Sequence, residues 1–107
     1  MKYEVVISEQ ADKDLRELFE YIAFELLAPD NAAGQLNRLE KAIDSLAVYP
    51  FRHAIYRVSP WMERGLHIMP VDNYCVLYIV EESEARASVL RVLYGGRDIK
   101  RVLDKGK

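Results

Sequence analysis

The first half of the chain carries two stretches in which apolar residues recur at helical spacing. The first stretch follows Ser8, a favourable N-cap residue, and we expect its helix to end near Ala28, because Pro29 disfavours a helical residue before it. The second stretch follows Asp30 and stops before Pro50. Only a short link separates the two helices, which predicts an antiparallel helical hairpin. The apolar positions are Ala11, Leu15, Leu18, Phe19, Ile22 and Leu26, then Leu36, Leu39, Ile43 and Leu46.

Runs of β-branched and aromatic residues lie on both sides of this hairpin and predict four strands. Short polar turns at 72–73 and 81–84 separate the last three strands, which predicts antiparallel pairing. The order of elements is therefore β-α-α-β-β-β, with a short C-terminal helix over Asp98–Leu103. We expect one α+β domain over residues 1–107, in which the helical hairpin packs on one face of a mainly antiparallel sheet. The predicted strands are Lys2–Ile7, Leu66–Val71, Tyr74–Val80 and Ala87–Tyr94.

The predicted strand Tyr74–Val80 is apolar at both alternating sets of positions. One set can be buried against the helices, whereas the other presents Cys75, Leu77 and Ile79 on the opposite face, or the reverse. A sheet face in contact with water normally alternates with polar residues. We therefore expect the second face to be covered either by the short C-terminal helix or by a partner.

Charge is distributed unevenly along the chain, although the net charge is only −2. Residues 1–49 contain five basic and ten acidic residues, a net charge of −5. Residues 50–107 contain ten basic and seven acidic residues, a net charge of +3, together with both histidines. If a polyanion is bound at all, we expect the half with the three strands to bind it.

Cysteine content, hydropathy and the lack of ligand motifs bear on the compartment of the protein, on membrane insertion and on cofactors. Cys75 has no partner for a disulfide, and no signal sequence is evident, which together indicate a cytoplasmic protein. The longest apolar run, Cys75–Val80, is far shorter than the roughly 20 residues that a bilayer-spanning helix needs. No metal-ligand spacing and no phosphate-binding glycine motif is present, so neither a metal nor a cofactor is expected.

Two motifs carry a family resemblance, Met69-Pro-Val-Asp-Asn-Tyr74 and Val92-Leu-Tyr-Gly-Gly-Arg-Asp98. They resemble the RelE/ParE superfamily, the toxins of type II toxin–antitoxin systems, which includes plasmid-stabilisation proteins. The resemblance implies a RelE/ParE-like fold and a growth-inhibiting toxin that a cognate antitoxin neutralises. RelE-like members are ribosome-dependent endoribonucleases that cut mRNA, whereas ParE-like members poison DNA gyrase and are not known as nucleases.

The matching positions favour the ParE branch. Nuclease members usually have an arginine directly after the tyrosine that Tyr74 matches, but here the next residue is Cys75. Nuclease members also tend to be strongly basic, and this chain is mildly acidic. The leading hypothesis is a ParE-like toxin that inhibits an essential target such as DNA gyrase. The alternatives are a RelE-like endoribonuclease and an inactive toxin-like protein that only binds an antitoxin, so whether the protein is an enzyme stays open.

Four residues are candidates for catalysis if the protein is RelE-like. Arg97 matches the corner arginine of the family and, with Arg91, would stabilise charge at the scissile phosphate. His67 or Tyr94 would transfer protons, and the 2′-hydroxyl of the RNA would be the nucleophile. Each has a structural alternative: Arg97 could pair with Asp98 or another surface acid, and Arg91 with an acid in the interior. His67 could be a hydrogen-bonding core residue, and Tyr94 could be a core aromatic residue.

The candidates for binding a target are Arg97, Arg64, Arg57 and Trp61. Arg97 follows two glycines that permit a tight turn, and a guanidinium can bind a phosphate or carboxylate through two hydrogen bonds. The other three lie in the loop 50–64, where basic and aromatic residues alternate, although the tryptophan could instead cap a core. The expected partners are a cognate antitoxin, DNA gyrase or the ribosome with its mRNA, and a second copy in a homodimer. The antitoxin should bring an amphipathic helix or an extended segment.

Overall fold

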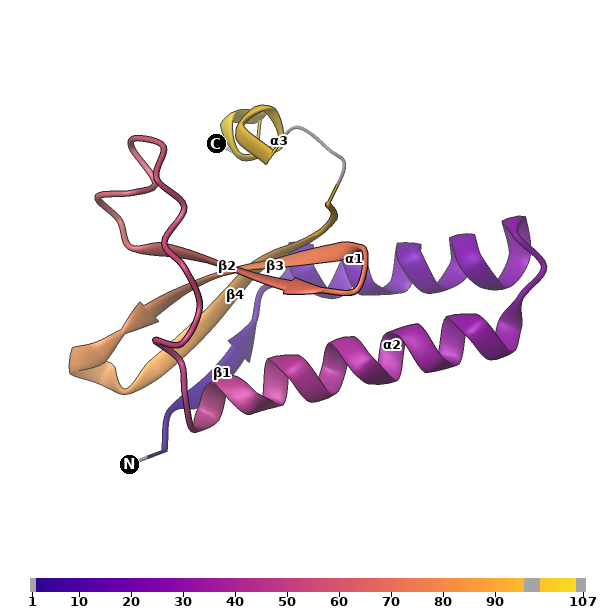
Figure 1. The fold of residues 1–107 in the computed structure, drawn as a ribbon, viewed down its shortest axis with the longest axis horizontal. Helices are drawn as coiled ribbons and strands as arrows, with labels where there is room; N and C mark the ends of the chain where they lie inside the picture. Colours follow the sequence, from indigo (N-terminus) through magenta and orange to yellow (C-terminus); the bar gives the residue numbers. More distant parts are fainter. Residues whose placement is uncertain (1, 96–98, 106–107) are drawn as a thin grey trace.

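The computed structural model describes residues 2–95 and 99–105, and it confirms the α+β fold (Figure 1). A four-stranded sheet in the order β1-β4-β3-β2 carries the two long helices on one face. None of the helices in these two ranges combines the length and apolarity needed to cross a membrane. The elements are β1 (Glu4–Ile7), α1 (Glu9–Glu20), a π-helical turn (Tyr21–Glu25), α2 (Pro29–Asp44), a 3-10 turn (Ser45–Ala47), β2 (Leu66–Val71), β3 (Tyr74–Glu81), a 3-10 turn (Glu82–Glu84), β4 (Arg86–Tyr94) and α3 (Ile99–Lys105).

The ends of the two long helices differ in part from the sequence-based prediction. Ser8 caps α1 as expected, since its hydroxyl accepts a hydrogen bond from the Ala11 amide at 3.0 Å. The α-helical hydrogen bonding ends at Glu20 rather than near Ala28, and a π-helical turn replaces it. Helix α2 begins at Pro29 rather than after Asp30, because a proline in the first turn has no amide hydrogen that would need a partner there.

The sheet is antiparallel except for β1, which pairs with β4 in parallel. Because β1 ends at Ile7, the outer edge of β4 beyond Val89 needs other partners. Ser8 supplies two of them: its amide donates to the Val89 carbonyl, and its hydroxyl donates to the Leu90 carbonyl at 2.9 Å. The chain therefore leaves the sheet edge and enters α1 while it still satisfies the polar groups of β4.

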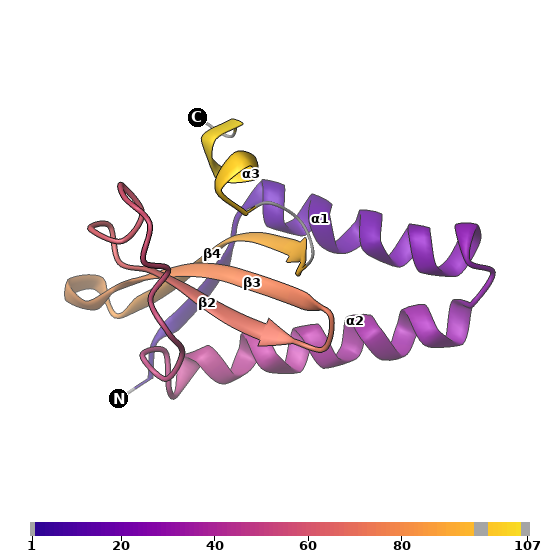
Figure 2. The same cartoon turned by 45° about the horizontal axis from the view of Figure 1, so that its top comes forward.

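The main core lies between the helical hairpin and one face of the sheet (Figure 2). The helices contribute most of the stripes that the sequence predicted, although Phe19 and Leu26, the latter 55% exposed, lie outside this core. Strand β3 contributes its even-numbered positions. Tyr78 is the largest of the fully buried side chains. The buried members of this core are Ala11, Leu15, Leu18, Leu39, Ile43, Leu46, Met69, Val76, Tyr78, Ala87, Val89 and Val92.

A second core covers the opposite face of the sheet. Its buried members are Trp61, Leu66, Leu77, Leu93 and Leu103. Trp61 comes from the loop before β2 and Leu103 from α3, and both figures place these segments on the side of the sheet away from α1 and α2. The sequence left open whether the C-terminal helix or a partner covers this apolar face. In the structure, α3 and the loop before β2 cover it.

Candidate functional site

Arg91, a candidate for phosphate binding, is held by an acid from α1. Its Nε and Nη2 atoms donate to the two carboxylate oxygens of Asp14 at 2.9 and 3.1 Å. One of these oxygens also accepts the Val92 amide at 3.0 Å. Both side chains are largely buried, at 20% exposed for Arg91 and 10% for Asp14. Of the two alternatives for Arg91, the structure shows the buried ion pair, in which Asp14 ties α1 to the edge of β4.

His67, a candidate proton-transfer residue, is only 6% exposed. Its Nδ1 donates to the His53 carbonyl at 2.8 Å, and its ring stacks on the Tyr78 ring with centroids 5.0 Å apart. The Tyr78 hydroxyl in turn donates to the buried Pro50 carbonyl at 2.7 Å. Burial lowers the pKa of the neighbouring His53 below its ordinary value of 6.5, and Arg52 and His67 lower it further. These contacts connect the loop after α2 to strands β2 and β3.

Tyr78 should make the protein less stable at alkaline pH. Burial raises the pKa of its hydroxyl from the ordinary 10.0 to about 12. Below the lower value the phenol is protonated in both states, and between the two values only the unfolded chain loses the proton, so stability falls as pH rises. Urea unfolding at stepped alkaline pH should show a steeper decline for the wild type than for Tyr78→Phe. A Tyr49→Phe control, at a residue that is 63% exposed, should match the wild-type slope; equal slopes for all three would contradict the assignment.

Tyr94 and Arg97 belong to the corner after β4. Tyr94 is 54% exposed, and its ring meets the Tyr74 ring edge-on, with centroids 5.8 Å apart. Arg97 lies outside the residues that the structure describes. Tyr94 pairs with Tyr74 of β3, and His67 pairs with Tyr78 of the same strand. Four residues of a strand span about 13 Å, so His67 and Tyr94 are at least about that far apart along the strand direction. His67, Arg91 and Tyr94 are therefore not gathered around one scissile bond.

The target-binding candidates of the loop divide into a buried and an exposed group. Trp61 is 9% exposed and belongs to the second core, so the structural alternative for this residue holds. The Arg64 guanidinium lies 4.9 Å from the centre of the Trp61 ring, which fixes an exposed cation above a buried aromatic residue. Arg57 is exposed in the same loop. Helix α3 packs beside this loop and adds Lys100 and Arg101, both exposed.

We call the surface formed by Arg57, Arg64, Lys100 and Arg101 the basic face. The loop around Trp61 and helix α3, which carry these residues, lie on the side of the sheet opposite the helical hairpin (Figure 2). The pattern of basic and aromatic residues located the loop part of this face, but it could not show that Trp61 serves as the support for Arg64. The contribution of α3 was also missed, because it depends on the packing of that helix beside the loop.

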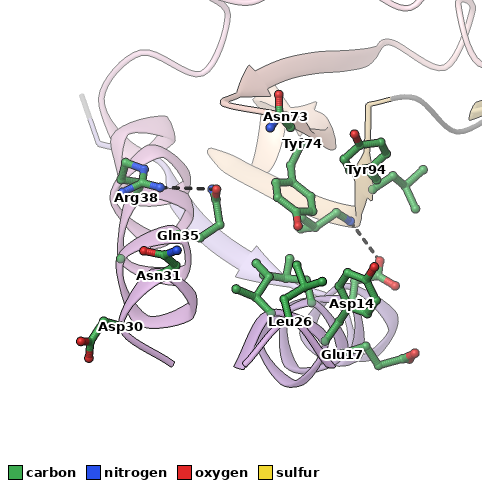
Figure 3. Close-up of a pocket in the computed structure, with 16 residues that line it drawn as sticks. Asp14, Glu17, Leu26, Asp30, Asn31, Gln35, Arg38, Asn73, Tyr74 and Tyr94 are labelled. Carbon is green, nitrogen blue, oxygen red and sulfur yellow. Dashed lines mark hydrogen bonds between the residues drawn. The ribbon is translucent and has the colours of Figure 1, made fainter. Parts of the chain in front are cut away.

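A cleft of about 960 Å³ lies between the helical hairpin and one end of the sheet (Figure 3). Three tyrosines line it: Tyr21 from the turn after α1, Tyr74 at the start of β3, and Tyr94 at the end of β4. Burial raises the pKa of Tyr74, and the nearby Tyr94 and Tyr21 hydroxyls raise it further. This cleft was not predictable from the sequence, since its walls come from residues more than 70 positions apart. Tyr74 does, however, belong to one of the two family motifs.

The wall that α2 contributes is held by a polar network at the β2–β3 turn. Asp72 accepts a hydrogen bond from Arg38 Nε at 2.7 Å and from Gln35 Nε2 at 3.0 Å. The Arg38 and Gln35 hydrogen bonds lower the pKa of the Asp72 carboxyl below its ordinary value. Asp72 itself has a positive φ of 54°, the left-handed conformation that aspartate tolerates in tight turns. The turn and α2 therefore keep a fixed relation on this side of the cleft.

Comparisons with known proteins show the family through a profile match and the fold through solved structures. The profile of the family described as "ParE toxin of type II toxin-antitoxin system, parDE" matches residues 5–99. A search of curated protein sequences gives no significant match. Among solved structures, the chain is similar to one from the chromosomal ParDE toxin–antitoxin system of P. aeruginosa, with a TM-score of 0.71, 13% identity, and coverage of 87% of this chain and 96% of that chain.

Two toxin–antitoxin complexes contain chains of the same fold, with TM-scores similar to each other. The RelBE2 complex of Mycobacterium tuberculosis matches with a TM-score of 0.63 and 22% identity, over 88% of this chain and 99% of that chain. The archaeal RelE–RelB complex of Pyrococcus horikoshii OT3 matches with a TM-score of 0.64 and 20% identity, over 92% of this chain and all of the other, 100%. At identities this low, the solved structures support the fold alone. The family assignment rests on the profile, which matches residues 5–99. The chain belongs to the ParE family of type II toxin–antitoxin toxins.

Proposed function

We propose that this toxin acts by binding and inhibiting a protein target through its basic face, as a ParE-like protein, rather than by cutting RNA. The observation that carries the proposal is the state of the nuclease candidates. Arg91 is held by Asp14, His67 is buried against Tyr78, and Tyr94 lies at another level of the sheet. In contrast, Arg57 and Arg64 are exposed in the loop 50–64, whose Trp61 packs with α3. Arg97 remains a candidate for the same surface.

The proposed partners follow from the family and the charge. DNA gyrase is the target to test first, because the profile that matches is that of the ParE toxins. A surface rich in arginine suits an acidic patch on such a target, where guanidinium groups can make paired hydrogen bonds with carboxylates. An antitoxin is proposed as the second partner, since the similar solved structures are toxin–antitoxin systems. A reducing cytoplasm, which the single cysteine suits, is the proposed location.

The purified toxin, tested against DNA gyrase, decides between the two activities. We expect supercoiling of relaxed plasmid to be inhibited in a dose-dependent way. In a parallel experiment, transcripts from cells that express the toxin should be intact when mapped by primer extension. Cleavage of mRNA in phase with codons, with gyrase unaffected, would overturn the proposal in favour of a RelE-like endoribonuclease. If gyrase is not inhibited and the mRNA stays intact, the inactive, antitoxin-binding alternative is left.

The double variant Arg57→Ala and Arg64→Ala should weaken inhibition of gyrase at least about tenfold, because arginines at the centre of an interface often contribute this much binding energy. Neither side chain is buried, so the variant should fold normally. Arg16→Ala is the matched control, since it removes an arginine that is 76% exposed on α1, on the other side of the molecule. Equal inhibition by the double variant and the control would refute the basic face. Arg97→Ala in the same assay tests the corner residue separately.

A further inference from the structure

The cleft between the hairpin and the sheet has a floor of aromatic rings. Tyr74 is half-buried at its centre, and Tyr94 meets it edge-on at 5.8 Å. Tyr21 faces the same space from the end of α1 and is 55% exposed. The close-up shows the Tyr74 ring directed into the space between α1 and α2, with the Tyr94 ring beside it (Figure 3). In an edge-to-face pair the edge of one ring covers one face of the other, and the faces that stay open are electron-rich and attract a cation.

The charges around these rings are predominantly negative. Three acids line the cleft, Asp14, Glu17 and Asp30. Asp14 is occupied by Arg91, whereas among the side chains that the structure describes, in residues 2–95 and 99–103, no ion pair forms at Glu17 or Asp30. Among the described residues that line the cleft, Arg38 is the single cation, and it is paired with Asp72 at 2.7 Å. Within the part of the chain that the structure describes, the unneutralised charge of the lining is therefore that of two carboxylates.

An apolar lip continues from the cleft to the end of the hairpin. Leu26 lines the cleft and is 55% exposed, and the adjacent Phe24 and Leu27 are 67% and 83% exposed. Large apolar side chains this exposed on one short segment are typical of a surface that another protein covers. The π-helical turn Tyr21–Glu25 carries part of this segment, and such turns occur frequently at functional sites.

We propose that the cleft binds a segment of a partner protein that inserts an arginine or lysine side chain among Tyr21, Tyr74 and Tyr94 while its apolar residues pack on the lip. The carboxylates of Glu17 and Asp30 attract the cation, and the tyrosine faces and hydroxyls hold it. A cleft of this volume accommodates a long cationic side chain together with part of the segment that carries it. The occupant is thus a basic amphipathic segment, bound on a surface separate from the basic face.

Two short amphipathic helical peptides that differ at one position test this inference. Both carry leucines along one face; one has an arginine within that face and the other a glutamate. With the intact toxin, fluorescence anisotropy should give at least about tenfold tighter binding for the arginine peptide, and its affinity should fall as salt screens the carboxylates. In NMR spectra, the ring signals of Tyr21, Tyr74 and Tyr94 should shift on binding, whereas those of the distant Tyr3 and Tyr49 should not.

A pair of charge-neutralising variants locates the site. Glu17→Gln with Asp30→Asn should weaken binding of the arginine peptide about fivefold or more, because each removes a carboxylate that lines the cleft. Glu20→Gln with Glu25→Gln is the control, since it removes the same charge from exposed residues of the hairpin that do not line the cleft. Equal losses in the two variants would mean that only overall charge matters and would overturn the proposal.

Three other outcomes would also overturn it: no measurable binding of either peptide, equal binding of both, or shifts confined to tyrosines outside the cleft. Dimerisation of the toxin alone, with the same three ring signals shifted as its concentration rises, would assign the cleft to a second copy instead. The gyrase assay is independent of these results. A toxin that binds the peptide but does not inhibit gyrase would retain the cleft and lose the proposed target, and the reverse would retain the target and lose the cleft.

Discussion

Asp14→Ala should lower the free energy of unfolding by about 3 kcal/mol or more, which is the usual cost of removing one partner from a buried ion pair. The substitution would leave the Arg91 guanidinium, 20% exposed, without its carboxylate. It would also leave the Val92 amide at the edge of β4 without its acceptor. Urea or thermal unfolding followed by circular dichroism measures the change, and a domain of this size should lose more than about 10 °C in Tm.

Asp12→Ala is the matched control for this prediction. Asp12 lies on α1 like Asp14, and it pairs with Arg16 of the same helix at 2.6 Å. In this pair, however, the side chains of Asp12 and Arg16 are 51% and 76% exposed. Exposed pairs contribute about 0–1 kcal/mol, so this variant should be nearly as stable as the wild type. If Asp14→Ala were as mild as Asp12→Ala, the ion pair would not be what holds α1 to β4. Arg91 would then be available for a partner or a phosphate.

Leu77→Ala should destabilise the protein by about 2–5 kcal/mol, the range for removing a buried leucine side chain and leaving a cavity. Leu77 is 0% exposed at the centre of the second core, where it packs with Trp61 and Leu103. The size of the loss therefore reports whether the loop and α3 cover this face of the sheet in solution. The same unfolding measurement applies.

Leu27→Ala removes the same atoms from a position that is 83% exposed, and its effect should stay within about 0.5 kcal/mol. A small effect for Leu77→Ala as well would mean that the second face is open in the isolated toxin. The covering of that face would then have to come from a partner, the alternative that the sequence left open.

The elements of the fold were predictable because their signals are local. The apolar stripes of α1 and α2 identify two helices, and the alternation and turns of 66–94 identify three consecutive strands. The errors occurred at helix ends. Periodicity does not distinguish an α-helical last turn from the π-helical turn Tyr21–Glu25, because both keep apolar residues on nearly the same face.

The candidate site was predictable only in part. The loop with Arg57 and Arg64 was identified from its composition, and the structure places both at the surface. The same pattern could not separate Trp61, which is buried, from residues that meet solvent, because a tryptophan among arginines suits either environment. The tyrosine-lined cleft was missed altogether, since Tyr21 meets Tyr74 and Tyr94 only after the hairpin packs on the sheet.

The sequence by itself determined the α+β class, the order of helices and strands, and the family, because periodicity and short motifs are properties of neighbouring residues. The tertiary structure alone decided how the charges and rings are used. Asp14 and Arg91 are 77 residues apart in the chain, and whether an arginine serves a partner or the fold depends on which distant carboxylate meets it. In the same way, the docking of α3 and the loop converted the second apolar face from an open surface into a core, since burial is settled by packing between distant segments rather than by their composition.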